Sequence, residues 1–563
     1  MKTKYILTLA AAAFMTVGCT DFLDRQPLDQ FTDDNLWTSE NNVSVFAFSL
    51  YNQFEGYGNG NSTKGFYFKQ FNDDMVSESF SDFSKNAPAS ACTYTFDKTI
   101  NQDVYTGTWA WDAIRKANVL LERVPKVPMS DAAKAHWTGV ARFFRAYEYF
   151  NKVKNYGDVP WVNKSLDISN GDILYKARDP RTLVMDSVLA DLNYACVNMY
   201  ANQGDDRVNR NVALALKSRV CLFEGTFRKY HKIADYEKYL QAAKESSATL
   251  INSTYKLCDS YRSIYNSLDL SKNSEIIMYK SYQTGVITHG MSGFLTSSTT
   301  IAGLNKGAVE SYVCKDGLPI SQSSLYKGDK NIANVLSDRD GRLSQTIDNG
   351  LCYVNHTYKG TTSTTGYKCF KFVNEDLSSA DRLAPNNPTD APLFWLSEVY
   401  LNYAEACAEL GTLNQSDLDI SINKLRTRAG VAPLKVVGGL PYSGTNGDVA
   451  INDPKRDTDV SPMIWEIRRE RRVELMMDGF RYDDLMRWTK GKYLDTTYNP
   501  ELFVGANIKD TDPNPSTKII VNAAGYIVAY NTSRAFDENK HYYLPIPTGQ
   551  ITLNPKLTQN PGW

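Results

Sequence analysis

Aromatic rings and acidic side chains are interspersed over residues 54–111, and this combination could recognise a sugar. Tyr57 and Trp109 lie toward the two ends of the stretch, and the acidic pair Asp73 and Asp74 lies between them. Flat rings can cover the C–H faces of a sugar, and carboxylates can accept hydrogen bonds from adjacent hydroxyls. The stretch therefore predicts contacts to a polyhydroxylated ligand.

A second stretch of similar character spans residues 279–312. Tyr282 and Tyr312 lie there in a context rich in Gly, Ser and Thr. A tyrosine offers both a ring face and a hydroxyl to a ligand, although any single ring could equally serve core packing. We predict that both tyrosines contribute to the same kind of site.

Neighbouring carboxylates such as Asp73 and Asp74 also suggest hydrolysis of a glycosidic bond. That chemistry needs two carboxyl groups about 5 to 9 Å apart facing one bond, whereas successive residues point in different directions. The chain has no HExxH or G-x-S-x-G motif, and its five histidines are scattered. We therefore expect a binding protein rather than an enzyme, with a surface glycoside hydrolase as the alternative.

The sequence indicates no metal, cofactor or nucleic-acid site. Lys and Arg total 62 against 63 Asp and Glu, which leaves no overall field to attract nucleic acid. Beyond Cys19, eight cysteines are scattered without a CxxC motif or metal-ligand spacing, so mostly buried thiols and at most one or two disulfides are expected. The turn at residues 338–341 lacks the remaining ligands of a recognised calcium loop.

The first residues have the pattern of an export signal. Lys2 and Lys4 precede an apolar run, residues 5–17, that is too short to span a bilayer. The Gly-Cys junction that follows resembles the lipobox of bacterial lipoproteins, in which the thiol is acylated. We predict that residues 1–18 are removed and that Cys19 carries a lipid that anchors the chain without spanning the membrane.

Helical periodicity dominates two blocks of the chain, because apolar residues recur there at spacings of three and four. Between the blocks, short β-prone runs such as EIIMYKSY and YKCFKFV are separated by clusters of Gly, Ser, Thr, Asn and Asp. The predicted order of the mature chain is a helical part, a loop-rich insert, a second helical part and an irregular tail, over residues 19–255, 256–390, 391–490 and 491–563. A second loop-rich insert is predicted within the second helical part, at about residues 432–460.

The helices of both blocks have lengths that suit pairing. Predicted helices cover residues 109–124, 132–153, 181–199, 211–230 and 235–250. WLSEVYLNYAEACAELG predicts a helix that stops at Gly411, and DLDISINKLRTRAG predicts a second helix closed by Gly430, a spacing similar to a tetratricopeptide unit. The predicted fold class is mainly α, a tetratricopeptide-like scaffold of helix pairs with a loop-rich, short-strand portion that binds the ligand.

The charged run IWEIRRERRVELMMDGFRYDDLMRW is interpreted as structural. Glu466 with Arg469, and Arg471 with Glu474, can pair at three-residue spacing. We expect a solvated or salt-bridged helix face there rather than a catalytic or nucleic-acid site.

Seven segments in order resemble the SusD/RagB family of outer-membrane lipoproteins. They are CTDFLDRQPLDQF, ARFFRAYEYFNKVKNYGDVPWV, LNKGAVESYVCKDGLPI, SEVYLNYAEACAELG, INKLRTRAG, the charged run above, and YYLPIPTGQITLNPKLTQNPGW, and they extend from residue 19 to residue 563. The resemblance implies a SusD-like, mostly helical fold and a lipid-anchored, surface-exposed protein of the outer membrane.

The resemblance also implies a function and partners. Family members capture glycans, or in some cases peptides, and act with a SusC-like TonB-dependent transporter, so an oligosaccharide ligand and such a transporter are the expected partners. Peptide capture and a purely structural transporter subunit stay open as alternatives. The sequence departs from the family at Trp395, where an Arg is common, and this ring is either core or an added stacking platform for the ligand.

Overall fold

The computed structural model describes most of the chain after residue 35. The described residues are 36–60, 72–76, 80–82, 87–88, 108–201, 204, 206–296, 303–353, 363–515, 519–530 and 533–563. The predicted signal sequence with Cys19 and the thiol of Cys92 lie outside this part. The other seven cysteines are free thiols.

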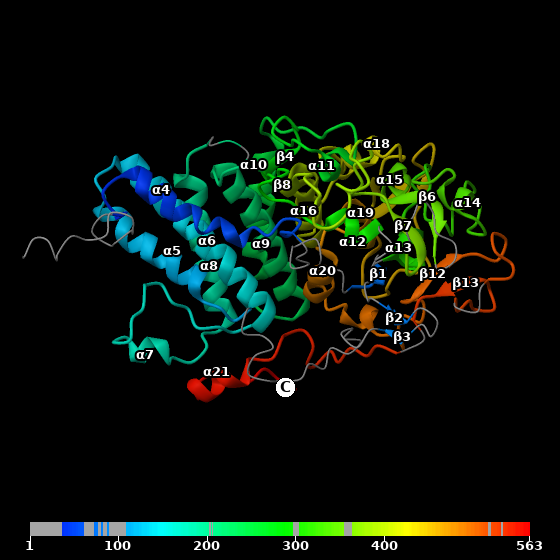
Figure 1. The fold of residues 1–563 in the computed structure, drawn as a ribbon. Helices are drawn as coiled ribbons and strands as arrows, with labels where there is room; N and C mark the ends of the chain where they lie inside the picture. Colours follow the sequence, from blue (N-terminus) through cyan, green and yellow to red (C-terminus); the bar gives the residue numbers. More distant parts are fainter. Residues whose placement is uncertain are drawn as a thin grey trace, which may run out of the picture.

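One half of the molecule is a stack of long helices, seen on the left of Figure 1. It contains α4 Glu40–Phe48, α5 Asp112–Arg123, α6 Asp131–Tyr156, α8 Arg181–Asn198, α9 Arg210–Tyr230 and α10 Tyr236–Ile251. From α5 onward each of these helices packs against the next, and α10 then packs against α16, Leu396–Glu409. This arrangement confirms the predicted mainly helical scaffold of helix pairs.

Local chemistry sets the ends of these helices close to the predicted positions. The Ser130 hydroxyl accepts a hydrogen bond from the Ala133 N–H and so caps the start of α6. The side chain of Asn209 caps α9 in the same way. Helix α6 ends at Gly157, whose φ of 71° lies in the left-handed region that glycine adopts without strain. Within the described residues, no helix is both long and apolar enough to cross a bilayer.

The other half is built from short helices, loops and small antiparallel sheets (Figure 1). β4 Ile276–Lys280 pairs with β8 Ala391–Trp395, which leads directly into α16. The remaining pairs are β1 Met75–Val76 with β5 Gly303–Leu304, β2 Phe80–Asp82 with β3 Ala87–Pro88, β6 Ile347–Cys352 with β7 Gly366–Cys369, and β12 Val504–Asn507 with β13 Tyr526–Val528. The β-prone run predicted at residues 275–282 thus contains β4, and the run predicted at residues 367–373 contains all of β7 except its first residue.

Two segments of this half differ from the sequence prediction. The helix expected to end at Gly430 is divided into α17 Gln415–Asp419 and α18 Ile422–Arg428, and the Ser421 hydroxyl donates to the Asp417 carbonyl at the break. The loop-rich residues 432–460 include a three-stranded sheet of β9 Lys435–Val437, β10 Leu440–Ser443 and β11 Val449–Ala450.

Further helices complete the loop-rich half and the connections. They are α7 Gly171–Leu174, α11 Ser263–Asn266, α12 Met291–Thr296, α13 Lys306–Ser311, α14 Ile332–Leu336, α15 Gly341–Thr346, α19 Pro462–Glu474, α20 Arg481–Arg487 and α21 Thr548–Leu553, with 3-10 turns η1 Tyr51–Gln53, η3 Val124–Lys126 and η4 Gly491–Leu494. Helix α19 packs against both α16 and α13. It therefore connects the helical stack to the loop-rich half.

The charged run on α19 is buried rather than solvated. Glu466 pairs with Arg469 at 3.1 Å, as predicted. Arg471 instead pairs with Asp484 at 2.9 Å, and Glu474 pairs with two arginines of other segments, Arg342 and Arg428. The predicted pair does not form between the described residues Arg471 and Glu474, because each of them pairs with residues of another segment. The run therefore joins several segments through internal ion pairs.

Candidate ligand-binding pocket

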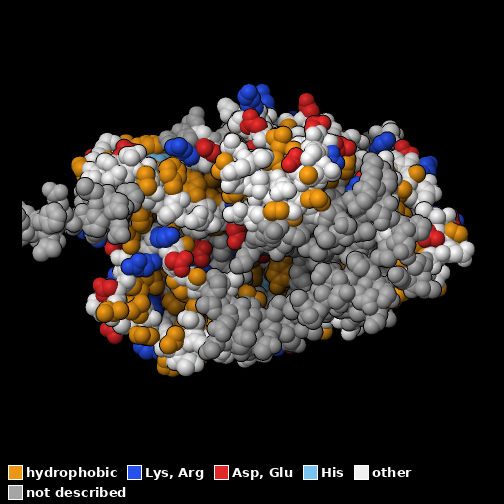
Figure 2. All heavy atoms as spheres, in the orientation of Figure 1, with side chains coloured by type: hydrophobic (Ala, Val, Ile, Leu, Met, Phe, Trp, Pro, Cys, Tyr) orange, Lys and Arg blue, Asp and Glu red, His pale blue; other side chains and the backbone are white. Residues whose placement is uncertain are grey.

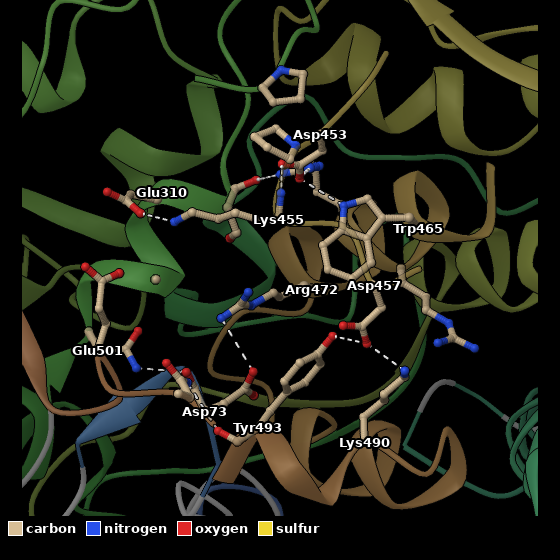
Figure 3. Close-up of a pocket in the computed structure, with 18 of the residues that line it drawn as sticks. Asp73, Glu310, Asp453, Lys455, Asp457, Trp465, Arg472, Lys490, Tyr493 and Glu501 are labelled. Carbon is tan, nitrogen blue, oxygen red and sulfur yellow. Dashed lines mark hydrogen bonds and ion pairs between the residues drawn. The ribbon is translucent and has the colours of Figure 1, made fainter. Parts of the chain in front are cut away.

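A pocket of about 500 Å³ opens in the loop-rich half beside α13, α19 and the segment that follows α20 (Figure 3). Its volume is typical of sites that bind small organic molecules. The wall combines the rings of Trp465, Tyr493 and Tyr498 with Pro319, Ile320, Pro454 and Pro500, and with charged residues from several segments.

The aromatic rings are held by hydrogen bonds to two carboxylates. The Trp465 indole N–H donates to Asp453 at 2.9 Å. The hydroxyls of Tyr493 and Tyr498 donate to opposite oxygens of Asp457, at 2.5 and 2.9 Å, and their ring centroids lie 5.6 Å apart. Figure 3 shows Trp465 and Tyr493 on either side of the Asp457 carboxylate. The rings are therefore fixed before any ligand arrives.

Ion pairs form much of the remaining wall. Arg472 pairs with Asp74 at 2.5 Å, and Lys490 pairs with Asp457 at 2.6 Å. At the rim, the Glu310 carboxylate lies between the ammonium groups of Lys306 and Lys455, at 2.8 and 2.5 Å. Charged groups held in this way can exchange hydrogen bonds with sugar hydroxyls while keeping their positions.

The cations keep the pocket carboxylates ionised. Burial alone would raise the pKa of Asp453, but Arg469 and further hydrogen bonds outweigh it and hold that pKa below its ordinary value. Burial would also raise the pKa of Asp457 and of Glu310. Lys490 with its hydrogen bond outweighs this effect at Asp457, and the two lysines outweigh it at Glu310, so the pKa of each carboxyl is lowered. These carboxylates can accept hydrogen bonds near neutral pH, and they are poorly suited to donate a proton.

Of the predicted ligand residues, Asp73 lies in the wall of this pocket. Asp74 lies next to it and receives a hydrogen bond from Arg472. Both carboxylates are nearly inaccessible, with 4% and 2% of their surface exposed. The Asn72 side-chain oxygen accepts a hydrogen bond from the backbone N–H of Asp74 and fixes this turn before β1. The two acids are therefore brought together to hold arginines of α19 and α20.

Tyr57 and Tyr282 are also brought together, but in the core. Their rings are nearly parallel with centroids 6.4 Å apart, and His289 contacts both. Tyr57 is fully buried and donates its hydroxyl to the Tyr265 carbonyl. Tyr282 is also buried and donates to the Gly58 carbonyl at 2.6 Å. We interpret both rings as packing between the N-terminal segment and β4.

The other three predicted rings are buried at separate places. Trp109 packs edge-on against Tyr156, Tyr312 donates to the Thr346 hydroxyl, and Trp395 lies between Tyr265 and Phe480. None of the three exposes more than 4% of its surface. Of the two roles left open for Trp395, its burial favours the core.

Sequence reasoning missed Trp465, Tyr493 and Tyr498, three of the aromatic residues that line the pocket. Trp465 lies within the run interpreted from its charges alone, and the two tyrosines lie in the predicted irregular tail. The clustering of Tyr493 and Tyr498 with Asp495 and Glu501 was an available signal, because it repeats the mixture of rings and acidic side chains sought elsewhere. A second pocket of about 540 Å³ beside η1 and β4 contains none of the seven predicted ligand residues.

Charged groups on the described surface are mixed in sign. On the face in Figure 2, Lys and Arg side chains are interspersed with Asp and Glu side chains. Among the described residues, no group of three or more His, Cys, Asp or Glu is arranged to hold a metal ion.

Comparisons with known proteins match both halves of the chain. A model described as "SusD family" matches residues 275–563, and one described as "Starch-binding associating with outer membrane" matches residues 21–222. The chain is 23% identical to a SusD-like protein of Bacteroides ovatus, over 100% of this chain and 98% of the relative. It is 25% identical to the starch-binding protein SusD of Bacteroides thetaiotaomicron, over 76% of this chain and 85% of the relative.

Solved structures show the same fold. A SusD-like carbohydrate-binding protein from Bacteroides fragilis superposes with a TM-score of 0.71 at 21% identity, covering 93% of this chain and all of that one. This likeness extends through both the helical stack and the loop-rich half.

Proposed function

The chain belongs to the SusD family, and on this premise we propose that it binds glycan oligomers in the pocket beside α13 and α19. The observation that carries the proposal is the placement of Trp465, Tyr493 and Tyr498 beside the ionised carboxylates of Asp453 and Asp457. Ring faces stack on sugar C–H surfaces, and fixed carboxylates accept hydroxyl hydrogen bonds. The names of the relatives, which include a starch-binding and a carbohydrate-binding protein, support a glycan as the ligand.

The electrostatics of the pocket favour binding over hydrolysis. A glycoside hydrolase needs a carboxyl group whose raised pKa lets it protonate the leaving oxygen. The described wall carboxyls Asp73, Glu310, Asp453 and Asp457 have lowered pKa values, because their cationic partners outweigh the effect of burial. Burial raises the pKa of the neighbouring Asp74, but this carboxyl is only 2% exposed and accepts a hydrogen bond from Arg472, which leaves it inaccessible to a leaving oxygen. This pattern supports a protein that holds its ligand without cleaving it.

The proposal places the protein at the outer membrane. Cleavage after residue 18 would leave Cys19 as a lipid anchor, and the match to a model described as associating with the outer membrane supports this location. In this proposal the anchored protein is exposed at the cell surface, and it delivers captured oligomers to a SusC-like TonB-dependent transporter.

A soluble protein beginning at Thr20 tests the binding function directly. It should bind one or more oligosaccharides on a glycan array, with calorimetric affinities between micromolar and millimolar and with no cleavage product in the same samples. Trp465→Ala should weaken that binding. Trp137→Ala is the matched control, because Trp137 is also half-buried and donates its indole N–H to a carboxylate, Glu40, on the helical half.

Three outcomes would redirect the proposal. Binding of peptides but of no glycan would favour the peptide-capture alternative. Release of shorter sugars would favour a hydrolase. Equal affinity of wild-type and Trp465→Ala proteins would move the glycan site away from this pocket.

A further inference from the structure

We propose that the pocket selects neutral glycans and excludes glycans that carry carboxylate or sulfate groups, an inference that rests on the glycan-binding function proposed above. It follows from the partners of the charged side chains that line the pocket. Recognition of an anionic sugar requires cations whose hydrogen bonds are available to it.

Each cation of the described wall is already paired with a carboxylate. Arg468 contacts Glu409 at 3.3 Å, and Arg469 bonds both Glu466 and Asp453. The other four wall cations have carboxylate partners at 2.5 to 2.7 Å, namely Arg472 with Asp74, Arg481 with Asp73, Lys490 with Asp457 and Lys455 with Glu310. An incoming anion would therefore compete with carboxylates that are covalently held in place.

The charge balance also opposes an anion. We count the charged residues of the described wall, their direct ion-pair partners, and Lys229, which pairs with Glu409. This set contains nine carboxylates and eight cations. The carboxylates are Asp73, Asp74, Glu310, Glu409, Asp453, Asp457, Asp459, Glu466 and Glu501, and the cations are Lys229, Lys306, Lys455, Arg468, Arg469, Arg472, Arg481 and Lys490. Since the pocket has no excess of positive charge, burying a further negative group there is unfavourable.

The pocket wall retains hydrogen-bond acceptors and apolar ring faces that can bind a neutral sugar. A carboxylate has about four lone-pair sites, so Asp453 or Glu310 can accept a hydroxyl hydrogen bond in addition to its ion pair. The half-exposed ring of Tyr498 and the partly exposed Trp465 offer apolar faces that carry no charge. Hydroxyl donors and C–H faces are what an uncharged oligosaccharide presents.

Two matched sets of hexasaccharides test the selectivity by calorimetry on the wild-type protein. The neutral set is maltohexaose, cellohexaose, laminarihexaose, mannohexaose and xylohexaose, and the anionic set consists of hexamers of galacturonate, alginate, chondroitin sulfate and heparin. We expect binding within the neutral set and at least about tenfold weaker binding throughout the anionic set. Tighter binding of an anionic hexamer would overturn the selectivity but keep glycan capture, whereas no binding in either set would contradict the proposed function itself.

A charge variant provides the converse test. Glu310→Gln removes the carboxylate that lies between Lys306 and Lys455, so Lys455 loses its carboxylate partner at the rim, whereas Lys306 keeps its pair with Glu501. We expect about tenfold tighter binding of the anionic hexamers, and this gain should weaken as salt is added. Glu375→Gln, which changes an exposed carboxylate paired with Arg262 at another site, should show no gain. Unchanged anion binding by Glu310→Gln would show that the wall carboxylates do not set the selectivity.

Discussion

Arg481 donates two hydrogen bonds to the carboxylate of Asp73, each 2.7 Å long, across a sequence separation of 408 residues. Asp73 precedes β1, and Arg481 is the first residue of α20. Both residues line the pocket, where the pair joins the N-terminal strand to the C-terminal helices. The geometry is the bidentate arrangement in which arginine and carboxylate bind most specifically.

Loss of this guanidinium should destabilise the fold. Arg481→Ala leaves Asp73 buried without its main partner, so we expect the free energy of unfolding to fall by about 3 kcal/mol. Urea unfolding measures the loss. Lys455→Ala is the control, because Lys455 has 59% of its side chain exposed and its pair with Glu310 should contribute about 1 kcal/mol or less. Equal losses in the two variants would contradict a special role for the buried pair.

Tyr498 should contribute to ligand affinity without supporting the fold. Its ring is 46% exposed at the pocket, so Tyr498→Ala should leave the unfolding transition almost unchanged. Loss of one stacking face should cost about 1 kcal/mol, or roughly fivefold in the Kd for the bound oligosaccharide. Tyr175→Ala removes a ring of similar exposure, 51%, beside α7 and should not change the Kd. A similar loss in both variants would indicate a nonspecific effect.

Trp109 should behave in the opposite way to Tyr498. It is 4% exposed and contacts Trp111 and Tyr156, so Trp109→Ala leaves a large cavity next to α6. We expect a loss of about 3 kcal/mol in unfolding free energy and an unchanged Kd for the folded protein. A variant of unchanged stability that no longer binds glycan would restore Trp109 as a ligand residue.

The helices were predictable from the sequence because the residues that determine each helix lie close together in the chain. The apolar spacing over residues 132–153 predicted what became α6, Asp131–Tyr156, and the stop at Gly411 has the expected left-handed backbone. Amphipathic spacing and capping residues act within a few turns of chain, so they can be recognised without knowing the neighbours.

The partners of charged groups were less predictable because they depend on tertiary contacts. The pair Glu466–Arg469 followed from helix spacing alone. Arg471 could not be assigned to Asp484 in this way, since that choice depends on where the tertiary fold places α20. The same limit applied to the pocket, where composition identified Asp73 but could not distinguish the exposed ring of Tyr498 from the buried ring of Trp395.

The buried carboxylate of Glu405 should make the fold sensitive to acid. Burial opposes ionisation, but the charge and hydrogen bonds of Arg487 outweigh it and lower the pKa of Glu405 from 4.5 to about 2. The unfolded chain therefore binds a proton more readily than the folded protein does. The resulting stabilisation, about 3 kcal/mol, should be present above pH ~5 and be lost as the pH falls toward about 2.

Comparison of wild-type and Glu405→Gln proteins isolates this contribution, because both contain the same other titrating groups. The difference in unfolding free energy should be largest near neutral pH and should shrink toward pH ~2 in a series of urea titrations. Glu375→Gln, at an exposed position, should differ little from wild type at any pH. A Glu405→Gln difference that is constant with pH would contradict the assigned pKa.

The predicted lipid on Cys19 should determine where the protein is found in the cell. Cys19→Ala removes the only thiol at the predicted cleavage junction, so the exported protein should lose labelling by radioactive palmitate and leave the membrane fraction. Cys196→Ala, which removes a half-buried thiol within α8, should stay labelled and membrane-bound. Membrane attachment that persists in Cys19→Ala would contradict the lipid anchor and require a protein partner to hold the chain there, whereas release with intact glycan binding would separate the anchor from the site.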